Sequence, residues 1–164
     1  MKLLMEDFTI VQSRRSAVAA MTKHGQPRSL QVAALCWRRN QRGKIRILLI
    51  TSRDTGRWVI PKGWPMHNRS HAEAAEREAF EEAGVQGNLR HESLGLFTYR
   101  KQLGRGRSIL CVVQVFALEV QTRLKKYPEN GQRRSVWLSR KKAAREVREP
   151  ELRTLIRKFN PDAR

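Results

Sequence analysis

The run of residues 70–84 constrains the fold of this chain more than any other stretch. Ser70 followed by Glu73 is the pattern of a capping box, in which each side chain satisfies a backbone N–H group of the other residue. Good helix formers fill the positions from His71 to Ala83, and Gly84 suits the left-handed conformation that ends many helices. The sequence therefore predicts a helix over residues 71–83.

Five of the fifteen acidic residues of the chain lie on this predicted helix. At about 100° per residue, Glu81 and Glu82 stand at about −60° and +40° from Glu78, so these three carboxylates share one face. Like charges at such spacings destabilise a helix, and the helix dipole disfavours negative charge in the last turn. Glu73 is explained as the capping partner of the N-cap serine, whereas Glu76 has no such explanation.

Two explanations are open for the three clustered glutamates. A Glu-rich helix face is commonly just solvated, but a divalent cation needs clustered hard oxygens and offsets their repulsion. The small side chains of Ala74 and Ala75 are expected near the same face, where they would leave room for an ion and its waters. The stripe expected to pack on the core consists of Ala72, Ala79, Phe80 and Ala83.

Runs of apolar residues predict the remaining elements. Strands are expected at residues 30–37, 45–51, 58–60, 94–99, 109–120 and 135–138, and helices at residues 140–147 and 151–159. The first two strands should form a hairpin, Pro61 should begin a loop that runs to Arg69, and a basic loop at residues 100–107 should separate two later strands. This order indicates an α/β fold in which a mixed sheet packs between helices.

Length and charge limit the domain organisation and the class of partner. A chain of 164 residues with 40% hydrophobic residues can bury one core, so we assign residues 1–28 to a basic N-terminal extension and residues 29–160 to one domain. No run approaches the roughly 20 apolar residues of a membrane span, and we expect a cytoplasmic protein. The net charge of +19 favours polyanions, namely nucleotides, polyphosphates, inositol phosphates, RNA or an acidic membrane surface. Cys36 and Cys111 lie in apolar runs, which predicts buried free thiols.

The stretch GWPMHNRSHAEAAEREAFEEAGV, residues 63–85, closely resembles the signature of the Nudix hydrolases. The wider run SRDTGRWVIPKGW resembles the diphosphoinositol-polyphosphate phosphohydrolase branch of that superfamily. The resemblance implies an α/β/α sandwich with a mixed sheet and a loop-helix-loop metal site. It also implies that Glu78, Glu81 and Glu82 bind the metal with the main-chain carbonyl of Gly63, and that Arg77 orients the carboxylates. Mg²⁺ is the expected ion, with Mn²⁺ as the alternative.

One position departs from this signature. The family has a glutamate six positions after its first glycine, where this chain has Arg69. Arginine cannot bind Mg²⁺ or accept a proton at neutral pH. Three consequences are open: a metal site with fewer ligands, a phosphate contact by Arg69 at the mouth of the site, or impaired catalysis.

The resemblance implies Mg²⁺-dependent hydrolysis of a phosphoanhydride bond in a substrate of the dinucleoside polyphosphate or diphosphoinositol polyphosphate type. The alternatives are an RNA 5′ pyrophosphohydrolase, or an impaired Nudix module that binds RNA or polyphosphate. Glu81 or Glu82 is the first choice for the carboxylate that accepts a proton from water. Glu129, in a predicted turn, is the other candidate, and it is equally well explained as an exposed turn residue.

Basic side chains are expected to hold the phosphates of the substrate. The residues predicted for this role are Arg53, Arg57, Lys62, Arg69, Arg105 and Arg107. Trp58, Trp64 and Tyr99 are candidates to stack on a base, although no aromatic pair has a spacing that identifies a stacking slot. The sequence does not decide the oligomeric state.

Overall fold

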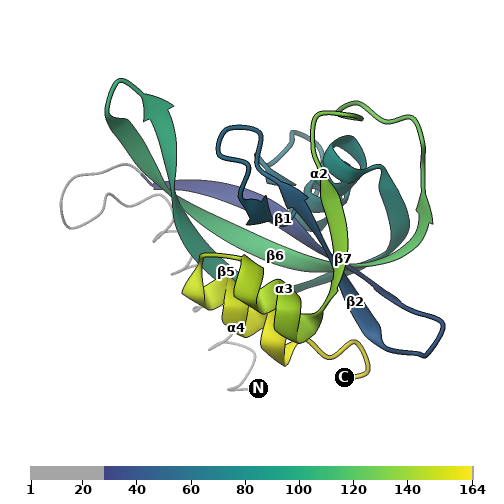
Figure 1. Ribbon diagram of the computed structural model, residues 1–164. Coiled ribbons are helices and arrows are strands. Elements are labelled where there is room, and N and C mark those ends of the chain that lie inside the picture. The colour runs from purple at the N-terminus through teal and green to yellow at the C-terminus, as the bar shows by residue number, and fades with distance from the viewer. Residues whose placement is uncertain (1–27, 164) are drawn as a thin grey trace, which may run out of the picture.

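A mixed sheet of seven strands forms the centre of the computed structural model, which describes residues 28–163 (Figure 1). The strand order is β3-β2-β1-β6-β5, while β4 pairs with β1 and β7 pairs with β2. Only β1 and β6 run parallel among the described pairs, and the others are antiparallel. The bounds of the strands are β1 Arg28–Arg39, β2 Ile45–Thr51, β3 Trp58–Val59, β4 Lys62–Gly63, β5 Val85–Gly104, β6 Arg107–Arg123 and β7 Ser135–Ser139.

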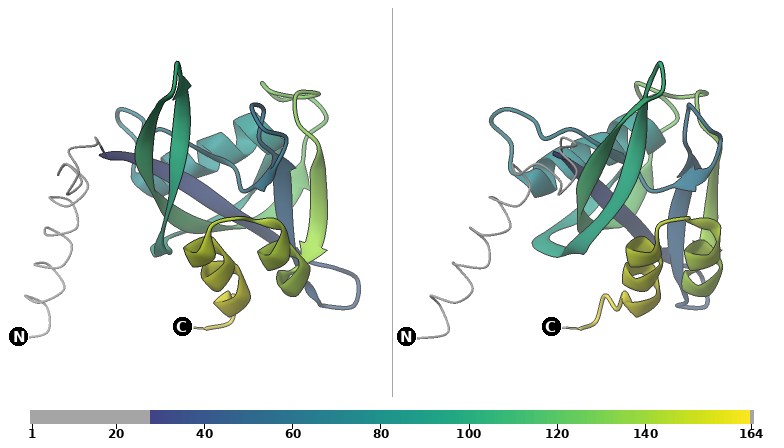
Figure 2. Two further views of the ribbon diagram at one scale, coloured as in Figure 1. Left: turned by 60° about the vertical axis from the view of Figure 1, so that its left-hand side comes forward. Right: turned by 90° about the vertical axis from the view of Figure 1, so that its left-hand side faces the viewer.

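Helices cover both faces of this sheet (Figure 2). Helix α2, His71–Ala83, packs on β1, β5 and β6, and its buried alanines join a core cluster that includes Val32 and Leu118. Helices α3, Arg140–Glu146, and α4, Pro150–Lys158, cover the other face, where Leu152 and Ile156 join a second cluster. The predicted α/β fold, with a mixed sheet between helices, is confirmed.

The ends of α2 are those that the sequence predicts. The Ser70 side chain accepts a hydrogen bond from the backbone N–H of Glu73, the Glu73 carboxylate accepts one from the Ser70 backbone N–H, and Gly84 is left-handed with φ 68°. Two expectations about the faces of the helix are wrong. Ala74 and Ala75 are fully buried and pack in the core cluster instead of lining the face of the glutamates. Phe80 is only half-buried and lies beneath the Arg77 guanidinium instead of in the core.

The predicted basic loop at residues 100–107 is wrong, because most of it is strand. Strand β5 runs to Gly104, β6 starts at Arg107, and the turn between them places Gly104, Arg105 and Gly106 at positive φ. Strand β5 also begins at Val85, directly after the helix. The result is a long hairpin that projects from the body of the molecule (Figure 1).

The edge of β1 that faces away from β6 is shared between two partners. Residues 37–39 pair with β2, whereas Val32 and Ala33 pair with Gly63 and Lys62 of β4. The expectation that residues 62–63 belong to a loop is therefore wrong, since Pro61 precedes a short strand that makes its hydrogen bonds with β1. This pairing fixes the start of the glycine loop relative to the sheet.

The remaining sequence predictions fall within a few residues of the observed elements. The hairpin of β1 and β2, the strand β7 and both C-terminal helices are present, with Pro150 as the first residue of α4 instead of a separator. Cys36 and Cys111 are free and buried. In the described residues no helix is long and apolar enough to cross a membrane. The proposed extension, residues 1–28, lies outside the described residues except for Arg28.

Candidate active site

A polar cleft of about 280 Å³ lies where α2 faces the loops that follow β2 and precede β7. Its carboxylates belong to Asp54, Glu78, Glu81, Glu82 and Glu129, and its cationic side chains to Arg53, Lys62, Lys101 and Arg133. A larger hollow of about 470 Å³ beside α3 and α4 is lined by Lys44, Arg46, Arg140, Lys141 and Arg157 and by no carboxylate. The cleft beside α2 thus combines cation-binding oxygens with phosphate-binding cations, whereas the larger hollow offers cations alone.

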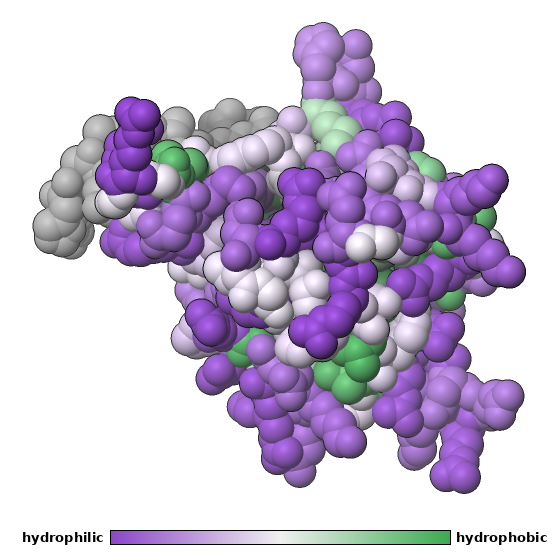
Figure 3. All heavy atoms as spheres, turned by 45° about the horizontal axis from the view of Figure 1, so that its top comes forward, coloured by the Kyte–Doolittle hydropathy of each residue, from purple (hydrophilic) through white to green (hydrophobic). Residues whose placement is uncertain are grey.

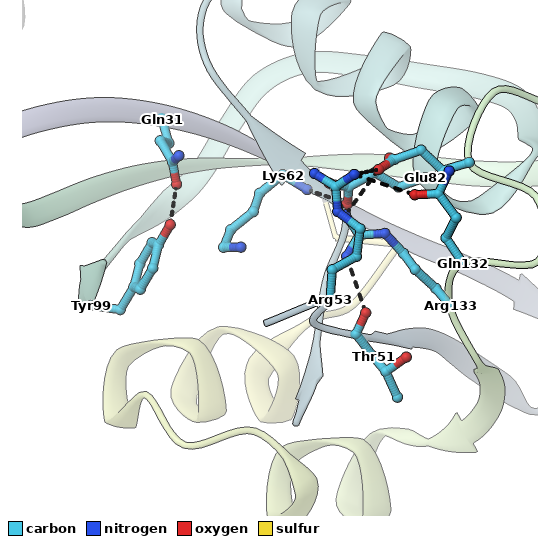
Figure 4. Close-up of polar contacts among 9 residues, drawn as sticks. Gln31, Thr51, Arg53, Lys62, Glu82, Tyr99, Gln132 and Arg133 are labelled. Carbon is cyan, nitrogen blue, oxygen red and sulfur yellow. Dashed lines mark hydrogen bonds and ion pairs between the residues drawn. The ribbon is translucent and has the colours of Figure 1, made fainter. Parts of the chain in front are cut away.

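Glu82 is the most enclosed carboxylate of the cleft. Its side chain is 9% exposed, and Arg133, 8% exposed, donates a hydrogen bond from Nη2 to Glu82 Oε1 at 2.9 Å. The backbone N–H of Lys62 donates to Glu82 Oε2 at 3.2 Å. Arg133 also donates from Nη1 to the carbonyl of Thr51, so this one side chain connects α2 to the end of β2 (Figure 4).

Gly63 lies against the carboxyl group of Glu78. A Cβ atom at position 63 would lie 2.2 Å from Cδ and Oε1 of Glu78, which is far inside van der Waals contact. The absence of a side chain at Gly63 therefore lets the Glu78 carboxyl group lie against the backbone of β4, and a side chain at this position would displace that carboxyl group.

Glu81 stands on the same face of α2 and is paired within the helix. The Arg77 Nε–H group donates to Glu81 Oε1 at 2.7 Å, and both side chains are partly exposed. Arg77 itself does not line the cleft. Among the described residues, no three His, Cys, Asp or Glu side chains are gathered closely enough to hold a metal ion. The Glu81 carboxylate is paired with Arg77, and the Glu82 carboxylate with Arg133.

Glu129 reaches the cleft from the segment between β6 and β7. Its backbone N–H donates to the carbonyl of Glu81 at 3.0 Å, which joins this segment to the C-terminal end of α2. Its side chain is 17% exposed and pairs with Arg53 at 2.9 Å and Arg133 at 3.4 Å. The structure therefore places Glu129 on the cleft, not as an isolated exposed turn residue.

Burial changes the acid–base chemistry of this cleft. Desolvation raises the pKa of Glu78 to about 7, with a further increase from the charges of Glu81 and Glu129. Desolvation also raises the pKa of Glu82 to about 7, although the Arg133 guanidinium and the Lys62 ammonium oppose the shift. The pKa of Lys62 is lowered by its own burial. Without a bound cation, both glutamates thus hold protons more tightly than an exposed carboxyl group does.

The structure brings together some of the predicted site residues and leaves others apart. Glu78, Glu81, Glu82, Glu129, Gly63, Arg53 and Lys62 all line the cleft. Arg57 does not, because its guanidinium is paired with the buried Glu149 at 2.6 Å. Arg69 lines two hollows around the first turns and the outer face of α2, and Arg105 lies in the hairpin turn next to Arg107. These four arginines are not at the cleft, so their predicted contact with phosphates is not supported by the geometry.

Sequence reasoning missed Arg133 as a site residue. It comes from a polar run before β7 that has no motif, and its two carboxylate partners are 51 and 4 positions away in the chain. A separation of four residues from Glu129 outside a helix carries no signal, so only the tertiary structure identifies this residue. Hydrophilic side chains dominate the face of the molecule in Figure 3, in agreement with a chain in which 30% of the residues are charged.

Comparison with known proteins gives a consistent family. The family model for the NUDIX domain matches residues 29–159. Nudix hydrolase 13, mitochondrial, from Arabidopsis thaliana is 35% identical over 125 residues, which cover 71% of this chain and 60% of that protein. Diphosphoinositol polyphosphate phosphohydrolase 2 from Rattus norvegicus is 37% identical over 67 residues, covering 41% of this chain and 36% of that protein. The chain thus spans less than two thirds of these relatives.

Solved structures share the same fold. A crystal structure of the Ap4A hydrolase from C. elegans, in a binary complex, aligns with a TM-score of 0.58 and 21% identity, covering 80% of this chain and 94% of that one. At this identity the likeness supports the fold alone. The mixed sheet with helices on both faces is therefore an arrangement that this chain shares with solved proteins.

Proposed function

This chain belongs to the Nudix family, and from that premise we propose that it hydrolyses a phosphoanhydride bond in a polyphosphorylated small molecule with Mg²⁺ as its cofactor. The proposed substrate classes are dinucleoside polyphosphates and diphosphoinositol polyphosphates. The observation that carries the proposal is the placement of Glu78, Glu81 and Glu82 on one face of α2, around a cleft that also holds Arg53 and Lys62. Three like-charged carboxylates on one helix face repel one another, and a bound cation would offset that repulsion.

The cleft offers the carboxylate oxygens that a hard divalent cation needs, although no three of them are gathered at one point in the described residues, so their side chains would have to turn toward the ion. Glu78, Glu81 and Glu82 would hold it, and Gly63 lets the Glu78 carboxyl group lie against the backbone at the start of the glycine loop. The ion pair between Glu81 and Arg77 is partly exposed, so its loss on metal binding costs only a few tenths of a kcal/mol. When bound, Mg²⁺ would neutralise charge on the phosphate oxygens and lower the pKa of an attacking water.

The other residues of the cleft bind and orient the substrate in this proposal. Arg53, Lys62 and Lys101 contribute cationic groups for the phosphates that flank the cleaved bond. Glu129 accepts the proton of the attacking water in this proposal, because it lies outside the proposed metal set and its backbone N–H group is bonded to the carbonyl of Glu81 at the end of α2. Arg133 holds Glu82 and Glu129 in place through its two ion pairs.

Hydrolysis of a defined panel tests this function. The full chain would be incubated with diadenosine tetraphosphate, a diphosphoinositol polyphosphate, nucleoside triphosphates and 5′-triphosphate RNA, with Mg²⁺, with Mn²⁺ and with chelator. We expect metal-dependent release of phosphate products from a small-molecule polyphosphate. Cleavage of the RNA end alone would favour the RNA pyrophosphohydrolase, whereas tight binding without cleavage of any substrate would indicate an impaired binding module.

A further inference from the structure

Trp64 is the one apolar side chain among the residues that line the cleft in the described chain. This residue is 44% exposed. Among residues 28–163, Leu103 is the only other large hydrophobic residue that is exposed. Leu103 does not line the cleft. An exposed indole that lines a polar cleft adds no core packing over its exposed part and is available to a ligand.

The backbone on both sides of Trp64 is fixed. Gly63 pairs with Val32 in the sheet and contacts the Glu78 carboxyl group, so the residue that follows starts from a defined point beside the carboxylates. Pro65 comes next, and the residue before a proline is restricted to extended conformations. The indole therefore has little backbone freedom to lose when a ligand stacks on it, which strengthens binding.

Lys101 adds a positive charge beside this ring. Its Nζ atom lies 5.9 Å from the centre of the Trp64 ring, and both side chains line the same cleft. Lys101 comes from β5, in the hairpin that projects beside the cleft. An aromatic face and a cation at neighbouring positions match a nucleotide, which carries a flat base and phosphates a few bonds apart.

The other aromatic candidates are partly buried and do not themselves line the cleft. Trp58 is partly buried against the core cluster beneath α3 and α4, with the Arg134 guanidinium 5.6 Å from its ring centre. Tyr99 is partly buried against the same cluster, and its hydroxyl group donates to Gln31 Oε1 at 2.6 Å. The structure thus singles out Trp64 among the three aromatic residues that the sequence left equivalent.

We propose that Trp64 stacks on the nucleobase of the substrate and so makes this chain specific for nucleotides, with dinucleoside polyphosphates preferred over diphosphoinositol polyphosphates. This inference rests on the proposed function, because it names the substrate class of the same site. An inositol ring is saturated and carries phosphates around its edge, so it offers no flat π face to the indole. A purine base offers one, and stacking of this kind is sequence-tolerant but needs an aromatic partner.

Steady-state kinetics of the full chain test the inference. The wild type, Trp64→Phe, Trp64→Ala and the exposed control Leu103→Ala would be compared on diadenosine tetraphosphate and on a diphosphoinositol polyphosphate. For Trp64→Ala we expect KM for the dinucleotide to rise about tenfold or more, the size of effect typical for loss of one stacked base, with kcat changed by less than about threefold. Trp64→Phe should retain most of the affinity, and Leu103→Ala should match the wild type on both substrates.

Several outcomes would overturn the inference. It fails if Trp64→Ala weakens both substrates equally, if it weakens neither, or if the wild type prefers the diphosphoinositol polyphosphate. If the wild type cleaves nothing with Mg²⁺, the proposed function fails separately. Calorimetric binding in chelator then decides the stacking: adenosine tetraphosphate should lose affinity in Trp64→Ala, whereas inorganic tetraphosphate should not, and equal losses would refute it.

Discussion

Replacement of Glu82 by Gln should stabilise the metal-free protein at alkaline pH while it abolishes turnover. Burial raises the pKa of Glu82 from its ordinary value of 4.5 to about 7, so the folded protein binds a proton here more tightly than the unfolded chain does. Stability from this group is present at low pH and is lost as the pH rises from 4.5 to about 7. Above pH 7 the folded state carries the full cost of an ionised, enclosed carboxylate.

The expected gain in stability follows from the difference between the pKa of Glu82 in the folded protein and in the unfolded chain. A pKa change from 4.5 to about 7 corresponds to roughly 3 kcal/mol at about 1.4 kcal/mol per pH unit. Gln keeps one acceptor oxygen, so it can serve either Arg133 or the Lys62 backbone N–H but not both, which costs about 1 kcal/mol. The net gain of roughly 2 kcal/mol corresponds to an increase of about 4–8 °C in Tm for a chain of this size.

Thermal melts in chelator at pH 8 and pH 5 measure this effect. At pH 5 the wild-type Glu82 is already protonated in the folded state, so the two Tm values should agree within about 2 °C. Saturating Mg²⁺ at pH 8 should stabilise only the wild type, and the variant should lose at least roughly two orders of magnitude in kcat. Glu76→Gln, on the same helix but away from the cleft, is the control. A variant that is no more stable than the wild type at pH 8 would refute the reasoning.

Three further substitutions test individual contacts. Gly63→Ala places a Cβ atom 2.2 Å from the Glu78 carboxyl group. We therefore expect Mg²⁺ affinity, measured by calorimetry, to fall at least roughly tenfold while the circular dichroism spectrum is unchanged. Unchanged Mg²⁺ affinity would contradict a role for this contact in metal binding. Arg69→Glu should change kcat/KM by less than about threefold and should leave Mg²⁺ affinity equal or higher, because Arg69 lies outside the cleft. A loss of Mg²⁺ binding would show that Arg69 has a structural role. Arg133→Met leaves the enclosed Glu82 without its cation. Because Glu82 can then take up a proton, stability at pH 8 should fall by about 1–3 kcal/mol in chemical unfolding, and an unchanged stability would remove Arg133 from the support of the site.

The helix that carries the site could be predicted from the sequence residue by residue. Its signals are local: Ser70, Glu73 and Gly84 act within a few positions of themselves, and the spacing of the glutamates fixes their common face. The mistaken faces of Ala74 and Phe80 have a different cause. Helix periodicity gives the angle between side chains, but it does not give the width of the buried stripe, which depends on how closely the sheet approaches.

The pairing of strands in the sheet could not be predicted from local sequence patterns. The parallel pair of β1 and β6 joins residues about 80 positions apart, such as Arg28 and Leu110, and no local pattern encodes that pairing. The strand at Lys62 was missed for a related reason, because its hydrogen bonds depend on a free stretch of β1 that only the fold exposes. Basic residues at 100–104 suggested a loop, yet they form one arm of a hairpin because an exposed ribbon tolerates charged side chains on both faces.

Composition gives the net charge of the chain, but it does not give the balance of charges inside the cleft. The net charge of +19 describes a long-range field that attracts polyanions to the whole surface, so composition indicates the class of ligand. Within the cleft the balance is different, since five carboxylates face four cationic side chains. Such a local reversal acts over less than the Debye length of about 8 Å, so it governs only groups inside the cleft. In the proposed function, the surface attracts the phosphates of the substrate, and the carboxylates on α2 determine where a cation would contact them.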